Sequence, residues 1–281
     1  MAIFARMHAP ARLAALCLVL GLSLGGCKKI DDLTATLGSQ TLAPAPADEA
    51  GLRQYAETLG GKYDRNPADK AVALAYAGAL RKLEHYAQAA AVLQRTAASH
   101  PADLDVLGAY GKALADAGRL NEASEVLARA HTPERPNWSI LSAQGSIADQ
   151  TGDHAAAQTY YEAALKIMPD QPSVLSNLGL SYALANDLPK AEATLRQAAD
   201  LPSADRRVRQ NYALVLALRG KFAEAEAISR RDLSPEEAAE NVATIKRTIA
   251  QSDTWRDLRK PPATRPAYTT ISTRNSSSPA K

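Results

Sequence analysis

Between residues 49 and 251, apolar side chains recur at the three- and four-residue spacing of amphipathic helices. The pattern also repeats itself, because the same arrangement of small and apolar positions returns every 34 residues. A fixed period of this size is typical of solenoids built from stacked supersecondary units. One phase of the repeat is marked by Ala89, Ala123, Ala157, Ala191 and Ala225.

A second set of small residues precedes these alanines by 12 positions in every repeat. Two helices joined by a short turn can pack about 8–10 Å apart only where the facing positions are small, so each repeat is expected to be a helical hairpin. A third position ends the first helix, where glycine or asparagine tolerates left-handed backbone; Glu84 holds it in the first repeat. The second set is Ala77, Gly111, Gly145, Gly179 and Ala213, and the other turn residues are Gly118, Gly152, Asn186 and Gly220.

This arrangement resembles the tetratricopeptide (TPR) repeat over about residues 70–235. The resemblance implies an all-α fold, a right-handed superhelical solenoid of about five repeats. An N-terminal half-repeat helix is expected before them, at about residues 49–63. The chain departs from the TPR pattern at Gln144, Ser229 and Asp232, where polar residues replace small or apolar ones.

Residues 234–251 carry the signature of one more helix after the fifth repeat. Ser234, Pro235 and Glu237 supply an N-cap, a first-turn proline and a capping-box acid. Repeat arrays need a terminal cap, so this helix is expected to cover the edge of the last repeat. Its apolar stripe consists of Val242, Ile245 and Ile249.

The N-terminus has the form of a secretory signal. Arg6 and Arg12 are its only charges, and the stretch from Leu13 to Gly26 is uncharged but shorter than the roughly 20 residues that a membrane-spanning helix needs. The ending Leu24-Gly25-Gly26-Cys27 resembles the lipobox of bacterial lipoproteins. That resemblance implies cleavage before Cys27 and lipidation of its thiol. An ordinary signal peptide with a chance cysteine, or an uncleaved anchor, remain alternatives.

The residue after Cys27 bears on location. In lipoproteins of this kind an aspartate there favours the inner membrane, whereas this chain has Lys28. The resemblance therefore implies a lipid anchor in the outer membrane, facing the periplasm. The expected segments are a lipoprotein signal peptide (1–26), the lipidated cysteine with a flexible tether (27–48), the TPR solenoid with its capping helix (49–251) and a disordered basic tail (252–281).

Charge and motifs argue against an enzyme or a nucleic-acid-binding protein. The chain has 33 basic and 30 acidic residues, and loss of the leader with its two arginines would leave (33 − 2) − 30 = +1. No HExxH or GxSxG motif is present, and GGK at 60–62 lacks the rest of a phosphate-binding loop. We expect no catalytic residues, no metal site, no cofactor, no small-molecule substrate and no nucleic-acid partner.

By the TPR resemblance, the first helices of the pairs line a concave face that binds partner proteins. A face rich in serine and amide side chains can hydrogen-bond an extended peptide. The lysine–asparagine clamp of chaperone-binding TPR domains is not expected, because Leu74 and Gly78 stand at its positions in the first repeat. The expected groove residues are Ser139, Ser142, Ser146, Asp149, Gln150, Ser173, Ser176, Asn177, Arg207, Gln210 and Asn211.

The C-terminal third is the most specific part of the sequence. Residues 173–200 and 206–246, above all RQNYALVLALRGKFAEAE, resemble the TadD family, the TPR lipoproteins of the tight-adherence (Flp, type IVc) pilus system. The resemblance implies a non-enzymatic scaffold or pilot for assembly of the Flp pilus secretion machinery, with the secretin as a plausible partner. The alternative is a periplasmic TPR lipoprotein adaptor that recruits peptidoglycan hydrolases.

Overall fold

The computed structural model describes residues 42–258, with side chains described as far as residue 251. This part of the chain is all-α, as expected, and its one β feature is an isolated bridge between Thr132 and Arg135. The helices are α2 (Glu49–Arg65), α3 (Lys70–Lys82), α4 (Tyr86–Ser99), α5 (Leu104–Asp116), α6 (Leu120–Ala128), α7 (Trp138–Gln150), α8 (His154–Ile167), α9 (Pro172–Leu184), α10 (Leu188–Asp200), α11 (Arg206–Leu218), α12 (Phe222–Ser229) and α13 (Pro235–Leu258).

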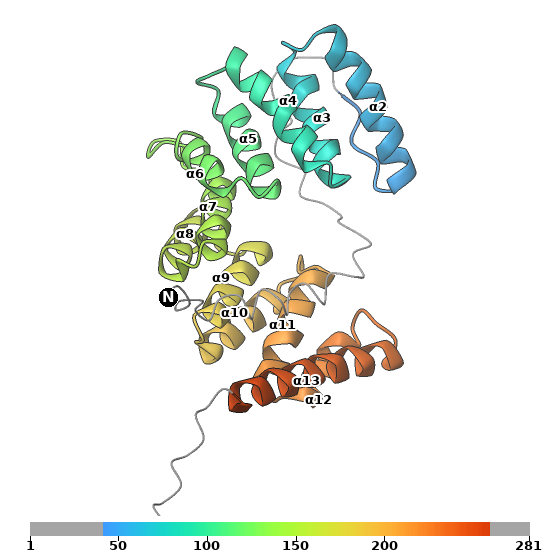
Figure 1. The fold of residues 1–281 in the computed structure, drawn as a ribbon, viewed down its shortest axis with the longest axis vertical. Helices are drawn as coiled ribbons and strands as arrows, with labels where there is room; N and C mark the ends of the chain where they lie inside the picture. The colour runs from blue at the N-terminus through green and yellow to red at the C-terminus, as the bar shows by residue number, and fades with distance from the viewer. Residues whose placement is uncertain (1–41, 259–281) are drawn as a thin grey trace, which may run out of the picture.

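The helices form five successive pairs, from α3–α4 to α11–α12, which follow one another around an arc (Figure 1). The expected half-repeat is α2, which packs against α3, and α13 packs against α11 and α12 at the other end. Apolar clusters run along the array instead of meeting at one centre. This is the solenoid that the 34-residue period predicts.

The turns inside the pairs share one backbone geometry. The turn residues adopt positive φ, for example 75° at Gly118, and the next N–H, that of Arg119, donates to the carbonyl of Leu114 at 2.9 Å. This bond satisfies a carbonyl that the end of the first helix would otherwise leave without a partner. Glu84 adopts the same conformation, with φ 61°, so the first repeat departs from the pattern in residue type but not in geometry.

The two helices of a pair meet at the small residues, as expected, but the detail of the contact differs from the prediction. A Cβ atom on Gly111 would lie 2.5 Å from Cδ2 of Leu127, and one on Gly179 would lie 2.6 Å from Cγ of Leu195. The nearest side chain to each of these glycines is therefore the large residue four positions after the repeat alanine, and Gly179 also approaches the carbonyl oxygen of Ala191, at 3.3 Å from the added Cβ. Ala123, one turn earlier, is also fully buried.

This contact predicts opposite effects for two Gly→Ala substitutions in first helices. Gly111→Ala should destabilise the array by about 1–3 kcal/mol, because the new methyl overlaps Leu127. Gly78→Ala is the matched control: a Cβ there meets nothing within 4 Å, so it should stabilise the fold by up to about 1 kcal/mol through helix propensity. Chemical denaturation followed by circular dichroism measures both, and equal shifts in midpoint would contradict the packing argument.

A buried carboxylate ties the fourth repeat to the fifth. The side chain of Glu192 in α10 is 2% exposed and accepts hydrogen bonds from Arg196 at 2.7 Å, from Lys221 at 3.0 Å and from Arg219. Burial alone would raise the pKa of Glu192, but the hydrogen bonds from these three cations outweigh it and hold the pKa below its ordinary value. Arg219 and Lys221 flank Gly220, so this network fixes the turn between α11 and α12.

Because the pKa of Glu192 is lowered in the folded chain, its stabilisation is present above the unfolded pKa and is lost as the pH falls through the folded pKa. Glu192→Gln should cost about 2 kcal/mol at pH 7, less than a fully buried pair because its cationic partners are partly exposed. The cost should shrink towards pH 3. Glu125→Gln, at an exposed site, makes the same charge change and should be nearly neutral at both pH values.

The capping helix begins as expected but ends later. Ser234 and Glu237 form the capping box, with the N–H of Ser234 donating to the Glu237 carboxylate at 2.9 Å and the N–H of Glu237 donating to Ser234 Oγ at 3.3 Å. Val242 and Ile245 are buried against the cluster that α11 and α12 form. The helix runs past residue 251 to Leu258, because no proline or glycine interrupts it there. The expected start of the disordered tail at 252 is therefore wrong.

The C-terminal part of the expected tether, from residue 42 onward, packs on α2. Leu42 and Ala45 pack against apolar side chains, and the hydroxyl of Tyr55 in α2 donates to the carbonyl of Ala43 at 2.9 Å. Asp48 then caps α2 by accepting from the N–H of Gly51 at 2.8 Å. The flexible tether expected over 27–48 is thus packed on the solenoid from residue 42 onward.

The signal peptide, Cys27 and the end of the tail lie outside the described residues. Within residues 42–258, none of the helices has the length and the apolar character that crossing a membrane requires.

Candidate partner-binding pocket

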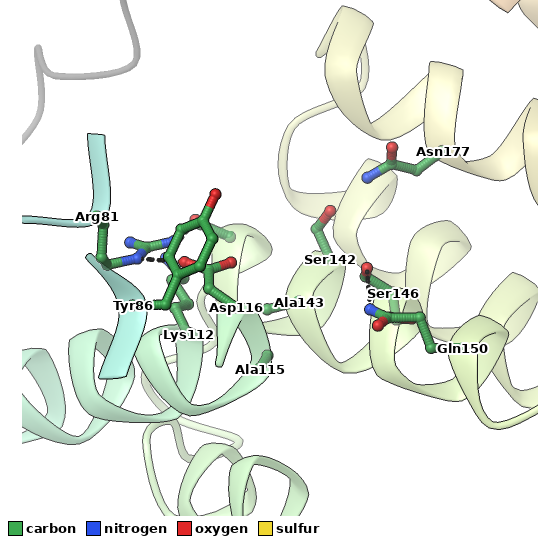
Figure 2. Close-up of a pocket in the computed structure, with 11 residues that line it drawn as sticks. Arg81, Tyr86, Lys112, Ala115, Asp116, Ser142, Ala143, Ser146, Gln150 and Asn177 are labelled. Carbon is green, nitrogen blue, oxygen red and sulfur yellow. Dashed lines mark hydrogen bonds and ion pairs between the residues drawn. The ribbon is translucent and has the colours of Figure 1, made fainter. Parts of the chain in front are cut away.

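A cavity of about 410 Å³ lies where the first helices of four successive pairs come together. We call it the inner pocket. Its walls come from α3, α5, α7 and α9, with one residue from the start of α4 (Figure 2). The lining residues are Arg81, Tyr86, Lys112, Ala115, Asp116, Ser139, Ser142, Ala143, Ser146, Gln150 and Asn177.

The inner pocket brings together part of the groove predicted from the sequence. Ser139, Ser142, Ser146 and Gln150 of α7 and Asn177 of α9 all line it. In Figure 2 the α7 and α9 side chains lie across the opening from the charged residues of α3 and α5. These hydroxyl and amide groups can hydrogen-bond a polar ligand.

Other predicted groove residues do not line this pocket. Ser176 is buried, 3% exposed, and accepts from the side-chain amide of Asn211 at 2.9 Å. Ser173 accepts from Gln171 at 3.0 Å. Arg207 is exposed and Gln210 is half-buried, on α11, beyond the walls of the pocket. The Ser176–Asn211 pair therefore links α9 to α11.

Sequence reasoning missed the charged residues of the pocket. Lys112 and Asp116 stand one repeat period before Ser146 and Gln150, so the repeat phase that selected the second pair also selects the first. The predicted groove begins one repeat later, at Ser139, and so leaves them out. Arg81 on α3 completes the charged group.

The charged group is arranged around Lys112. Its ammonium donates to Oγ of Ser139 at 2.7 Å, while Nε of Arg81 donates to the carboxylate of Asp116 at 2.6 Å. Burial, and secondarily the positive charge of Arg81, lower the pKa of Lys112 to about 8, and Asp116 opposes the shift. The pocket therefore holds a desolvated cation beside an internally neutralised pair.

Asp149, predicted as a groove residue, does not line the inner pocket, and its carboxylate joins three helices. Its carboxylate accepts from Ser181 Oγ at 2.8 Å and from the Tyr161 hydroxyl at 3.2 Å, and lies 2.9 Å from Nδ1 of His154. Burial and the charge of Asp149 raise the pKa of Tyr161. Because α7, α8 and α9 all contribute, the network joins the third repeat to the fourth.

Asp149→Ala should lower the free energy of unfolding by about 2–3 kcal/mol, because it leaves buried hydroxyls of neighbouring helices without an acceptor. Gln150→Ala, the exposed neighbour on α7, should stay within about 0.5 kcal/mol of the parent. Urea unfolding of the two variants side by side makes the comparison. A stable Asp149→Ala variant with weakened partner binding would restore the original interpretation.

The described residues offer no cluster of three or more His, Cys, Asp or Glu side chains that could hold a metal ion. The inner pocket is instead a hydrogen-bonding and charged surface, which suits recognition of a polar segment.

Two family models describe the repeats. Both are tetratricopeptide repeat models, one matching residues 80–144 and the other 142–206. The matched part of the chain, residues 80–206, consists of tetratricopeptide repeats, and the fold is that of a TPR solenoid. TPR folds generally act as non-catalytic scaffolds for protein interaction. Comparison with curated proteins finds no match.

Solved structures share the fold of this TPR protein. PilW, a widely conserved type IV pilus biogenesis factor, has a TM-score of 0.60 at 17% identity, covering 69% of this chain and 91% of PilW. PilF of Pseudomonas aeruginosa has a TM-score of 0.50 at 20% identity, covering 74% and 89%. The Cut9–Hcn1 tetramer of the APC/C gives 0.56 at 16% identity, with 69% of this chain matched to 40% of the other. At these identities the likeness concerns the fold.

Proposed function

We propose that this TPR protein is an outer-membrane lipoprotein that serves as a scaffold or pilot in assembly of the Flp (Tad) pilus secretion machinery. It binds a partner protein, plausibly the secretin, along the face that contains the inner pocket. The observation that carries the binding role is the pocket itself, where four successive first helices present charged, hydroxyl and amide side chains.

The pilus assignment rests on sequence and is supported by shape. Residues 206–246, which resemble the TadD family, form the fifth helix pair and the first half of the capping helix, so the resemblance includes the end of the solenoid. Two pilus-biogenesis proteins, PilW and PilF, share the TPR fold over most of their own length. The lipobox at Cys27 supplies the proposed anchor.

Acyl chains contribute about 0.8 kcal/mol for each buried CH₂ group, so a multiply acylated Cys27 would hold the protein on the membrane almost irreversibly. Cys27→Ala should therefore move the protein out of the membrane fraction and abolish surface pili. Cys17→Ala is the control within the same leader and should leave both unchanged. Normal piliation by the Cys27→Ala variant would contradict the proposal.

Affinity capture from detergent-solubilised membranes tests which partner protein the chain binds. Recovery of secretin or other pilus components is the expected result. Recovery of peptidoglycan hydrolases with no pilus component would favour the alternative, an adaptor for those enzymes.

A further inference from the structure

Lys112 is a partly buried cation that the chain itself leaves incompletely paired. Its ammonium has three N–H donors, and its one side-chain hydrogen bond among the described residues is the bond to Ser139. None of the described carboxylates forms an ion pair with it; the nearest candidate in the pocket, Asp116, pairs with Arg81. A desolvated charge without a counter-charge is unfavourable, so a bound anion would relieve this cost.

The other networks of the solenoid show the contrast. The carboxylate of Glu192 is surrounded by three cations, whereas Lys112 has a hydroxyl as its neighbour. Glu192 is buried and Lys112 is partly buried, yet only the charge of Glu192 is balanced by an ion pair within the described residues. Lys112 also lines a cavity that opens to solvent on the first-helix face, so a ligand can reach it.

The opposite wall supplies hydrogen bonds. Ser142 and Ser146 on α7 and Asn177 on α9 face the charged group across the opening (Figure 2). Their hydroxyl and amide groups can donate to the oxygens of an anion or to the backbone of the chain that carries it. The pocket thus combines one cation with a set of neutral donors.

The charge count favours a carboxylate over a phosphate. Arg81 and Asp116 cancel one another, which leaves about one positive charge on Lys112 to meet a ligand. Asp116 would repel a doubly charged phosphate more strongly than a singly charged carboxylate. A singly charged anion with two acceptor oxygens matches this arrangement.

We propose that the inner pocket binds an acidic side chain of an extended segment of the partner protein, with Lys112 forming the ion pair and Ser142, Ser146 and Asn177 donating hydrogen bonds. The inference rests on the proposed function as a partner-binding scaffold and names the chemistry of the partner. Leu74 and Gly78, which stand at clamp positions in the first repeat, do not line the pocket.

Binding is measured with the full chain in detergent and a fluorescein-labelled hexaglutamate peptide, with hexaglutamine as the uncharged probe. Lys112→Met keeps the apolar stem of the side chain and should weaken hexaglutamate binding at least tenfold. Lys166→Met removes an exposed lysine of α8 and should leave the affinity unchanged. Equal affinities for the parent and both variants, or equal binding of both peptides, would overturn the proposal.

Two further arms keep the test independent of any folding defect in Lys112→Met. Ser142→Glu adds a negative charge to the pocket wall and should also weaken hexaglutamate binding; unchanged affinity would count against the proposal.

The affinity of the parent protein for hexaglutamate should fall about tenfold between pH 7 and pH 9, as Lys112 deprotonates around its pKa of about 8. Of the other ionisable residues lining the pocket, Arg81, Tyr86 and Asp116, none is of a type that ordinarily titrates in this window. A flat profile would contradict the role of Lys112.

Carbodiimide crosslinking in native membranes identifies the occupant, because it joins an amine directly to a carboxylate. We expect Lys112 linked to an Asp or Glu of another protein. A link to Asp31 or Asp32 of the same chain, or displacement of hexaglutamate by an equal concentration of inorganic phosphate, would overturn the assignment.

The two proposals can fail separately. If Cys27→Ala leaves pili intact but Lys112→Met abolishes hexaglutamate binding, the function is wrong and the pocket chemistry stands. If pili require Cys27 but Lys112→Met captures the same partners with the same yield, the scaffold stands and the pocket chemistry is wrong.

Discussion

The distance between the two helices of each pair is the constraint on which the rest of this molecule depends. At Gly111 the approach is so close that a single methyl group would overlap Leu127, and the same holds one and two repeats later. Because each pair contacts mainly its neighbours, this close approach is repeated along the array, and the small rotation from one repeat to the next gives the array its curvature. That curvature brings Arg81 and Asn177 to one pocket although almost three repeats separate them in sequence.

The period of the sequence was enough to predict the helix pairs, the turns and the small residues between helices. It could do so because each of the five repeats needs the same residue size or backbone conformation at the same position. Even Glu84 adopts the positive φ that the equivalent positions of the other repeats reach with glycine or asparagine. The sequence did not identify Leu127 as the nearest neighbour of Gly111, since spacing along a helix does not reveal which side chain of the next helix is nearest.

The site was less predictable, for reasons that particular residues make clear. Ser146 and Gln150 were predicted because they are polar and in phase. Lys112 and Asp116 share that phase one repeat earlier, but the predicted groove begins at Ser139. Asp149 was predicted as a groove residue from the repeat pattern, whereas its hydrogen-bond partners Tyr161 and Ser181 lie on other helices, where the pattern does not reveal them. A sequence shows which face a residue occupies but not whether a neighbouring repeat has already satisfied it.

The packing of residues 42–47 on α2 changes how an anchored body would be held. A lipid on Cys27 would connect to the solenoid through residues 28–41, which at full extension reach roughly 50 Å, against roughly 70 Å if the chain were loose as far as residue 48. Tension from the membrane anchor would act on the solenoid at the Tyr55–Ala43 contact. It would therefore act on the side of α2, and not on the N-terminal end of that helix. The contact with α2 would then restrict the range of orientations that the solenoid can adopt relative to its anchor.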